Sequence, residues 1–315
     1  MSEFLKIQSD SLKIEISPYG AALARVWLAG HDTSLVLGLD RPEDYRTAPD
    51  YSGVIVGPIA GRVSGASFNL QGATHEMEAN AGKHCLHSGS DGIQNQLWDV
   101  VNCKGDTITL SLSVSDGSCG LPGARRILAT YTVSGSNLIL SIDSTSDRNT
   151  AFNATLHAYW ALDSYADLDT HRLQVQSTHM CETGHDLIPT GQIIDMSDTD
   201  HDFSAEKSPM SGSALDGCFC FDGDTAVRPM MTLRSTRSGI GMQVHSNQPG
   251  LVLYTGEFLT PGPNQPSLPQ SRPFSAIAIE AQGWPDAVNN ENFPSILLKA
   301  SARKQQITRF SFTQP

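Results

Sequence analysis

The chain lacks the sequence features of several large functional classes. Its 33 Asp and Glu outnumber its 21 Lys and Arg, which leaves a net charge of -12 and no basic stripe to bind a phosphate backbone. No stretch approaches the roughly 18 consecutive apolar residues that a membrane-spanning helix requires. We therefore expect neither a nucleic-acid partner nor a membrane partner.

Motifs of cofactor and nucleophile chemistry are also missing. The chain contains no GxxxxGK[ST] loop and no GxGxxG after a strand, the two glycine-rich patterns that cradle nucleotide phosphates. It contains no GxSxG turn to present a nucleophilic serine. The sequence predicts no nucleotide cofactor and disfavours a triad hydrolase.

The six cysteines are too sparse for a disulfide scaffold and form no CxxC pair. Cys218 and Cys220 form a CxC, and His84 and His87 form an HxxH, but neither pair has a second half that would complete four zinc ligands. We expect reduced thiols and no metal.

Residues 1–6 lack a basic region followed by an apolar run, which favours a cytoplasmic location.

Helical periodicity is scarce, whereas alternation with a period of two is common. Apolar and polar residues alternate from Thr107 to Val114, as expected of a half-buried antiparallel strand. Similar runs occur within residues 12–16, 127–133, 138–142, 251–259 and 307–312, and only Arg41 to Tyr45 suggests a short helical turn. Strands with one apolar face predict an all-β fold, a large antiparallel β-sandwich whose sheets stack on their apolar faces.

Nothing in the sequence divides the chain into parts. The 315 residues show no shift in composition and no charge run, so we expect a single domain over residues 1–315. No repeat of fixed period is visible, which argues against a propeller. The proline-rich residues 260–269 predict a surface loop, because proline disrupts a sheet interior.

Glu280 lies near the end of an apolar strand-like run, Ile277 to Gln282, that precedes a turn. At the strand period, Ala276 and Ala278 share its face and leave open space beside the carboxylate. By spacing alone, a solvated surface glutamate is the commoner case. A catalytic base is the alternative.

His157 lies in a second alternating run, Ala151 to Leu162. Phe152, Leu156 and Trp160 occupy one face, while the other face carries His157 with hydroxyl and aromatic neighbours that suit a sugar. The histidine is therefore predicted to point away from the core. A solvated histidine is again the commoner alternative.

Two glycine-rich loops and one turn supply further polar candidates. Arg62 lies in the loop Gly57 to Gly65, and His87 in the loop His84 to Gly92. A surface ion pair and a turn hydrogen bond are equally good interpretations of these two residues. Asp216 precedes a glycine and could be a simple turn aspartate.

The order of these residues resembles the aldose 1-epimerase family, also called galactose mutarotases. The resemblance runs through most of the chain: its elements are Arg62 with the hairpin Phe68 to Gly72, His84 to Gly89, Leu97-Trp98, His157 to Trp160, Ile188 to Gly191, Asp216 with Phe219, Tyr254 to Gly256, Glu280 to Gln282, Pro285 to Asn289, and Phe293 to Ser295. Single elements are weak, but their order and the C-terminal block are specific.

The resemblance implies a supersandwich fold, an isomerase that needs no cofactor, and a shallow cleft that binds a small-molecule aldose. It assigns Glu280 as the general base and His157 as the general acid, and Arg62, His87 and Asp216 to sugar binding. Neighbouring positions depart from the family pattern, namely Gly61, Ser88, Gly217, Thr155 and Ala161. These departures leave the identity of the sugar open. The sequence also does not decide the oligomeric state, which could be a monomer or a homodimer.

The implied reaction opens the sugar ring by removing the C1 hydroxyl proton and protonating the ring oxygen. Ordinary pKa values, about 4.3 for Glu and about 6.5 for His, predict an ionised Glu280 and a protonated His157, with Asp216 favouring the imidazolium. Two alternatives remain: an epimerase for an anionic or phosphorylated sugar, with Arg125 and Arg126 as extra cations, and a non-catalytic carbohydrate-binding or sensing module.

Overall fold

The computed structural model describes residues 3–165, 167–221, 225–262 and 268–314. Strands dominate these residues, and every pairing between named strands is antiparallel. The predicted all-β fold is therefore confirmed. No helix in the described part of the chain is both long and apolar enough to cross a membrane.

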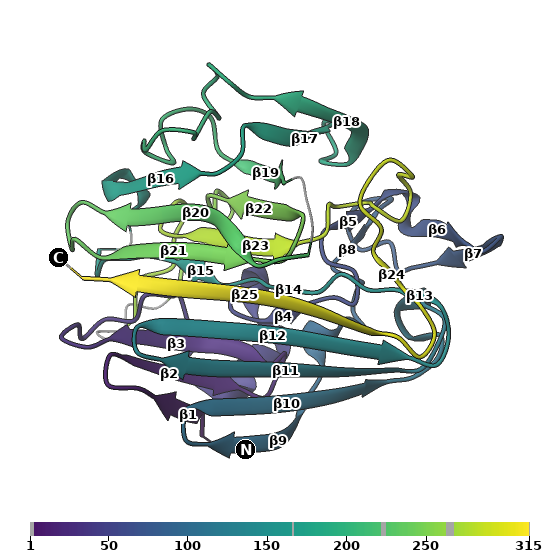
Figure 1. The fold of residues 1–315 in the computed structure, drawn as a ribbon, viewed down its shortest axis with the longest axis horizontal. Coiled ribbons are helices and arrows are strands. Elements are labelled where there is room, and N and C mark those ends of the chain that lie inside the picture. Colours follow the sequence, from purple (N-terminus) through teal and green to yellow (C-terminus); the bar gives the residue numbers. More distant parts are fainter. Residues whose placement is uncertain (1–2, 166, 222–224, 263–267, 315) are drawn as a thin grey trace.

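The largest sheet has eight strands in the order β16-β20-β21-β25-β12-β11-β10-β9 (Figure 1). Their bounds are β9 Asp99–Lys104, β10 Thr107–Val114, β11 Arg125–Ser134, β12 Asn137–Ser146, β16 His171–Val175, β20 Arg228–Ser235, β21 Gly241–Ser246 and β25 Arg303–Thr313. Burial alternates along β10, β11 and β12, so one face of this sheet is buried and the other faces solvent.

The second sheet has six strands in the order β15-β23-β22-β19-β17-β18. Their bounds are β15 Tyr159–Trp160, β17 His179–Thr183, β18 Pro189–Asp195, β19 Asp216–Cys220, β22 Gly250–Tyr254 and β23 Ile277–Gln282. All six residues of β23 are buried, so both faces of this strand are covered. That burial explains the near-continuous apolar run around Glu280.

Smaller elements surround the two sheets. They are the three-stranded sheet β1 Leu5–Gln8, β2 Leu12–Ser17 and β3 Ala22–Leu28, and the pairs β4 Ile55–Val56 with β14 Thr155–Leu156, β5 Arg62–Val63 with β8 Cys85–Leu86, β6 Ser67–Leu70 with β7 Ala73–Glu76, and β13 Thr150–Ala151 with β24 Leu297–Leu298. The helices are short 3-10 turns: η1 Pro42–Thr47, η2 Pro49–Tyr51, η3 Ser64–Ala66, η4 Ile93–Asn95, η5 Ser118–Gly120 and η6 Leu168–Thr170.

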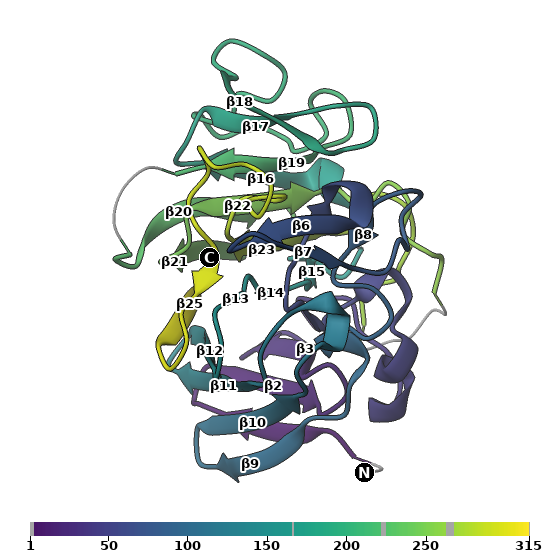
Figure 2. The ribbon, with the colours of Figure 1, turned by 90° about the vertical axis from the view of Figure 1, so that its right-hand side faces the viewer.

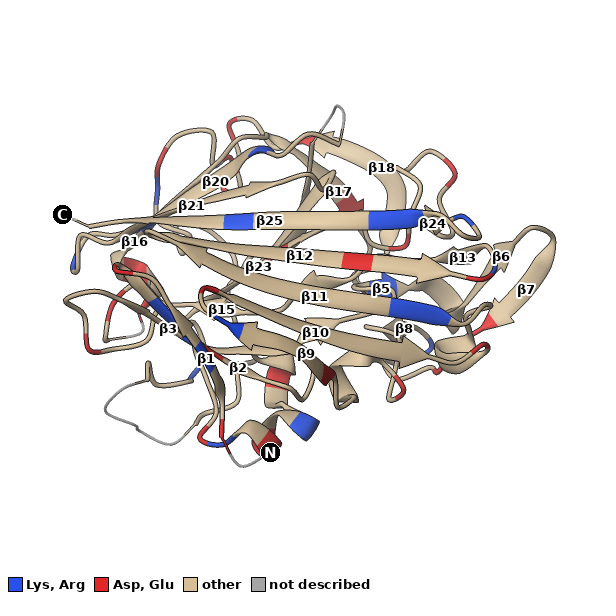
Figure 3. Cartoon of the chain, turned by 60° about the horizontal axis from the view of Figure 1, so that its bottom comes forward, with Lys and Arg blue, Asp and Glu red and all other residues tan. Residues whose placement is uncertain are grey.

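The main core lies between the sheets. Trp160 of β15 packs against Phe310 and Phe312 of β25, with ring centroids 4.8 and 5.7 Å apart. In Figure 2 the small sheet β1-β2-β3 lies beside β9, β10 and β11, and its apolar residues join the same cluster. Figure 3 shows charged residues on the long strands of the eight-stranded sheet, where Arg303 of β25 pairs with Asp143 of β12 at 2.7 Å.

Two local predictions differ from the structure, and a third falls partly outside the described residues. The run Ala151 to Leu162 is not one strand but three two-residue strands, β13, β14 and β15, because its backbone pairs in turn with β24, β4 and β23. The run at 251–259 ends as a strand at Tyr254. In the predicted loop 260–269, residues 263–267 lie outside the described residues.

Candidate active site

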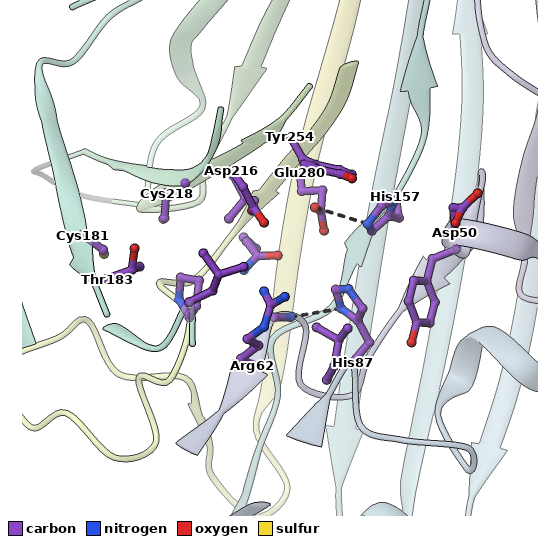
Figure 4. A pocket seen from close by; sticks show the side chains of 18 of the residues that line it. Asp50, Arg62, His87, His157, Cys181, Thr183, Asp216, Cys218, Tyr254 and Glu280 are labelled. Atoms are coloured by element: carbon purple, nitrogen blue, oxygen red, sulfur yellow. Dashed lines mark hydrogen bonds and ion pairs between the residues drawn. The ribbon is translucent and has the colours of Figure 1, made fainter. Parts of the chain in front are cut away.

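A pocket of about 310 Å³ opens over one face of the six-stranded sheet. Strand register places Glu280, Val252 and Cys218 in one row across β23, β22 and β19. The next row contains Tyr159, Ala278, Tyr254 and Asp216. Because alternate residues of a strand share a face, Gln282 lies on this face with Glu280. The side chains that line the pocket therefore come from a single sheet surface, with loops closing the sides (Figure 4).

Glu280 and His157 point toward each other in this pocket (Figure 4). The distance between His157 Nε2 and Glu280 Oε1 is 3.6 Å. The two residues are only 5% and 3% exposed. His157 does point away from the main core, as predicted, but into a pocket rather than into bulk solvent. The solvated alternatives for both residues are therefore wrong.

Backbone pairing and aromatic rings hold His157 in place. Its N–H donates to the carbonyl of Val54 at 2.9 Å, and its carbonyl accepts from the N–H of Gly53 at 2.9 Å. Its ring lies 5.8 Å from the Tyr51 ring and 5.1 Å from the Tyr159 ring, centroid to centroid. These contacts leave Nδ1 without a hydrogen-bond partner among the described residues. The other ring nitrogen, Nε2, faces Glu280 in the pocket.

His87 is positioned as a neutral hydrogen-bond donor. The backbone N–H of Gly61 donates to its Nδ1 at 3.1 Å, so in the neutral ring the proton is on Nε2. Burial holds the pKa of His87 well below its usual value, and His157 and Arg62 act in the same direction. Gln94 supports the loop by donating to the carbonyl of His87 at 2.8 Å. The predicted hydrogen-bonding role of His87 in its loop is present, and the side chain also lines the pocket; sugar binding by His87 stays a prediction.

Arg62 and Asp216 line the same pocket as the Glu280–His157 pair. Arg62 begins β5 and Asp216 begins β19, and both line the pocket. Asp216 is exposed toward the pocket, yet the surrounding protein partly desolvates its carboxylate and raises its pKa, while Arg62 opposes this shift. Arg62 also lowers the pKa of Glu280. The five residues predicted from the sequence therefore lie around one pocket (Figure 4).

The surroundings of Glu280 and His157 shift both pKa values away from the ordinary values on which the predicted protonation states depend. Burial raises the pKa of Glu280 to about 8, and Asp216 adds to the rise. Burial lowers the pKa of His157 to about 4. Near neutral pH the pair therefore holds one proton, on the carboxyl group rather than on the imidazole. Asp216 raises the pKa of Glu280 and does not favour an imidazolium at His157. Removal from water penalises the carboxylate of Glu280 and the imidazolium of His157 alike.

Several residues that flank the candidates support the architecture instead of facing the pocket. Thr155 Oγ1 donates to the carbonyl of Ala281 at 3.0 Å, and Asn153 Oδ1 accepts from the N–H of Gly283 at 2.6 Å. Ser88 Oγ accepts from the N–H of Ile59 at 2.8 Å. These bonds join the loops to the end of β23, so the polar face predicted for residues 151–162 is only partly a sugar face.

Part of the pocket wall was not predicted from the sequence. The additional polar and aromatic lining residues are Asp50, Tyr51, Tyr159, Cys181, Thr183, Cys218, Tyr254, Phe258 and Gln282. Tyr159 shares the alternating face of His157, and Gln282 that of Glu280, so a signal existed for these two. Gln282 Oε1 is buried with no partner among the described residues, which suits a sugar hydroxyl. No sequence pattern pointed to Tyr51 or Cys181.

No group of three or more His, Cys, Asp or Glu side chains in the described ranges is arranged to hold a metal ion. The ionisable side chains that line the pocket include Glu280, His157, His87, Arg62 and Asp216, which can transfer protons or form hydrogen bonds. An open pocket with a one-proton acid and base pair, a cation and several neutral donors is typical of an enzyme for a small polyhydroxylated substrate.

Comparison with known proteins agrees with that class of site. The family model for aldose 1-epimerase matches residues 3–311, so the chain belongs to the aldose 1-epimerase family of isomerases. The resemblance expected from the motifs is confirmed.

Individual relatives match over nearly the whole chain. A galactose mutarotase from Bos taurus is 28% identical over 99% of this chain and 94% of its own length. An aldose 1-epimerase from Streptococcus thermophilus is 30% identical over 84% and 80% of the two chains. The crystal structure of an aldose epimerase homologue from C. elegans superposes with a TM-score of 0.93 at 27% identity, over 100% of this chain and 99% of that one.

Proposed function

We propose that this isomerase interconverts the α and β anomers of an aldose by opening and reclosing the sugar ring at Glu280 and His157. The observation that carries the proposal is the buried pair itself, whose nearest atoms are 3.6 Å apart on the pocket face of the sheet. Anomer exchange needs one group to take the C1 hydroxyl proton while another protonates the ring oxygen. Two groups that share one proton can perform both steps without a cofactor.

The proton alternates between the two groups during the cycle. In the ring-closed complex, Glu280 as carboxylate accepts the C1 hydroxyl proton, and His157 as imidazolium donates to the ring oxygen. The opened sugar then faces a protonated Glu280 and a neutral His157, the same distribution that burial favours in the empty pocket. After rotation about the C1–C2 bond, the transfers reverse and close the other anomer. Total protonation of the pair is constant throughout.

The remaining pocket side chains bind and orient the sugar in this proposal. Arg62 and the Nε2 proton of His87 donate to hydroxyl oxygens, and Asp216 accepts from hydroxyl groups. Arg62 also favours the carboxylate form of Glu280, because its positive charge lowers the pKa of that carboxyl group. Arg62 thereby offsets part of the free-energy cost of ionising the buried Glu280, which must be a carboxylate before it can accept a proton.

The anionic-sugar alternative is not favoured. Arg62 is the only Lys or Arg among the described pocket-lining residues, which also include Asp50, Asp216 and Glu280. Arg125 lies on β11 of the other sheet and donates to the carbonyls of Ser115 and Ser118, so it does not line the pocket. A phosphate would meet net negative charge. The pocket therefore fits a neutral aldose.

The non-catalytic module is disfavoured by the pair and by the relatives, which are named as mutarotases and epimerases. Sugar binding alone does not require a buried carboxyl group next to an imidazole.

We also propose a cytoplasmic location, in keeping with six free thiols in the described residues. Monomer and homodimer both stay predictions.

Polarimetry that starts from a pure α-aldose tests the proposal. We expect Glu280→Gln to lower the mutarotation rate roughly 10²–10⁴-fold while the protein still folds, since Gln keeps the shape of Glu but cannot accept the proton. Glu206→Gln is the matched control, because Glu206 is an exposed residue that pairs with Arg234 outside the pocket. A wild-type rate in Glu280→Gln would refute the assignment. Sugar binding without any acceleration in the wild type would favour the binding module.

A further inference from the structure

Three thiols lie together in one wall of the pocket. Cys181 of β17 lies beside Cys218 and Cys220 of β19, and the sulfur atoms of Cys181 and Cys220 are 3.4 Å apart. Cys181 and Cys218 line the pocket, and Figure 4 shows both beside Thr183 and Asp216. All three residues are more than nine-tenths buried against the rest of the protein. The pocket is thus a route by which a small molecule reaches Cys181.

The three thiols differ in the direction in which their surroundings shift the pKa. Hydrogen bonds from the thiols of Cys218 and Cys220 lower the pKa of Cys181, although burial opposes the shift. The same interaction, with burial, raises the pKa of Cys218 and Cys220. The 3.4 Å separation of the Cys181 and Cys220 sulfur atoms is the contact through which this interaction acts. A thiolate, not a thiol, is the nucleophile in cysteine chemistry.

We propose that Cys181 is a reactive thiol of the sugar pocket, which a peroxide oxidises and Cys220 then captures in a Cys181–Cys220 disulfide. The Cys181 thiolate attacks one peroxide oxygen, the O–O bond breaks, and a sulfenic acid forms at Cys181 while hydroxide, or alkoxide from an organic peroxide, departs. The Cys220 sulfur then attacks the sulfur of the sulfenic acid, and water leaves with the Cys220 proton. Two thiols lose two electrons, and the peroxide gains them.

The disulfide changes the pocket wall. An S–S bond is about 2.05 Å long, so the two sulfur atoms approach each other from 3.4 Å and draw β17 toward β19. Asp216 and Cys218 lie on β19 and face the pocket, so both shift with this strand. We expect oxidation to reduce kcat/KM severalfold and a thiol reductant to restore it. This effect on turnover rests on the proposed function, whereas formation of the disulfide does not.

The test treats the full chain with hydrogen peroxide and maps disulfides by mass spectrometry of unreduced peptides. The expected result is loss of two thiols, a Cys181–Cys220 crosslink, and a severalfold fall in mutarotation that dithiothreitol reverses. Prior addition of a sugar that binds the pocket should slow alkylation of Cys181 by iodoacetamide. Oxidation of Cys103 alone, or a crosslink that excludes Cys181, would overturn the proposal.

Two variants separate the chemistry from the fold. In Cys220→Ser the sulfenic acid has lost its partner at 3.4 Å, so dimedone should label Cys181 and the Cys181–Cys220 crosslink should not form. Cys103→Ser is the control, because Cys103 is exposed on β9 and outside the pocket, and its peroxide response should equal that of the wild type. A crosslink that leaves mutarotation unchanged overturns the effect on turnover. Absence of mutarotation before oxidation refutes the proposed function, while the crosslink still decides the thiol chemistry.

Discussion

At the scale of single residues, the proposed chemistry depends on one proton shared by Glu280 and His157. Burial moves their two pKa values in opposite directions and past each other, to about 8 and about 4. Between these values the pair holds one proton, which is the state that a coupled acid and base require. The pH dependence of the rate therefore reports on the pair.

We expect a bell-shaped profile of kcat/KM against pH. Below about 4 the imidazole of His157 takes up a second proton, and the pair has no base. Above about 8 Glu280 loses the only proton, and the pair has no acid. Polarimetry over this range, corrected for mutarotation catalysed by the buffer, measures both limbs. A single limb centred near the ordinary histidine value of about 6.5 would contradict the shared proton.

Arg62 is expected to set the position of the alkaline limb. Its charge lowers the pKa of Glu280, so Arg62→Gln should move that limb to higher pH. The variant should also raise KM, because a donor to the sugar is lost. Arg126→Gln is the control, since Arg126 is exposed on β11 outside the pocket. If Arg62→Gln raises KM with no movement of the limb, its charge does not act on Glu280.

At the scale of elements, the connection after β23 joins the catalytic strand to the loop that carries Arg62. The N–H of Asp286 donates to the carbonyl of Arg62 at 3.1 Å, and Asp286 Oδ1 accepts from the N–H of Ser64 at 3.0 Å and from Asn289 at 2.8 Å. The C-terminal motif Pro285 to Asn289 thus has a structural role. Asp286 is a positioning residue.

Asp286→Ala should lower the free energy of unfolding by about 0.5–1.5 kcal/mol for each hydrogen bond lost, because it removes the acceptor of the partly buried N–H of Ser64 and of the Asn289 side chain. It should raise KM more than it lowers kcat, since loss of the bond to Ser64 loosens the segment that follows Arg62 and leaves Glu280 and His157 in place. Denaturant unfolding and polarimetry measure the two effects. Asp99→Asn, an exposed change on β9, controls for surface charge. An unchanged KM in a destabilised Asp286→Ala would show that the tie to Arg62 has no catalytic consequence.

At the scale of the whole molecule, the buried carboxyl group of Glu280 makes stability depend on pH. Its pKa is about 8 in the folded chain and about 4.3 in an unfolded one. Between these values the folded state binds one more proton than the unfolded state, so its stabilising contribution is full below about 4.3 and is lost as pH rises through about 8. His157, whose folded pKa is lowered, contributes with the opposite sign at acid pH.

The difference in unfolding free energy between wild type and Glu280→Gln isolates this term. The wild type should lose free energy of unfolding relative to Glu280→Gln as pH rises from about 4.3 to about 8, and the difference should then stay constant. Urea unfolding of both proteins at matched pH values measures it, and Glu206→Gln should show no such trend. A constant difference across the range would mean that Glu280 is ionised in the folded protein.

The sequence by itself determined the all-β class and the candidates at the site. Alternation along residues such as Thr107 to Val114 records which side of a strand is apolar, and that pattern is local. Glu280, His157, Arg62, His87 and Asp216 were recognisable as candidates because motif order also survives in the sequence. One domain over residues 1–315 stays a prediction.

Only the tertiary structure decided how these residues meet. The 3.6 Å approach of His157 to Glu280 depends on the pairing of β15 with β23, which no local pattern encodes. The pKa values of the pair depend on burial from all sides, which raises that of Glu280 and lowers that of His157, and ordinary pKa values do not include this effect. The thiol cluster arises because β17 and β19 are neighbours. Distances and desolvation are properties of the packed sheets, whereas residue order is a property of the chain.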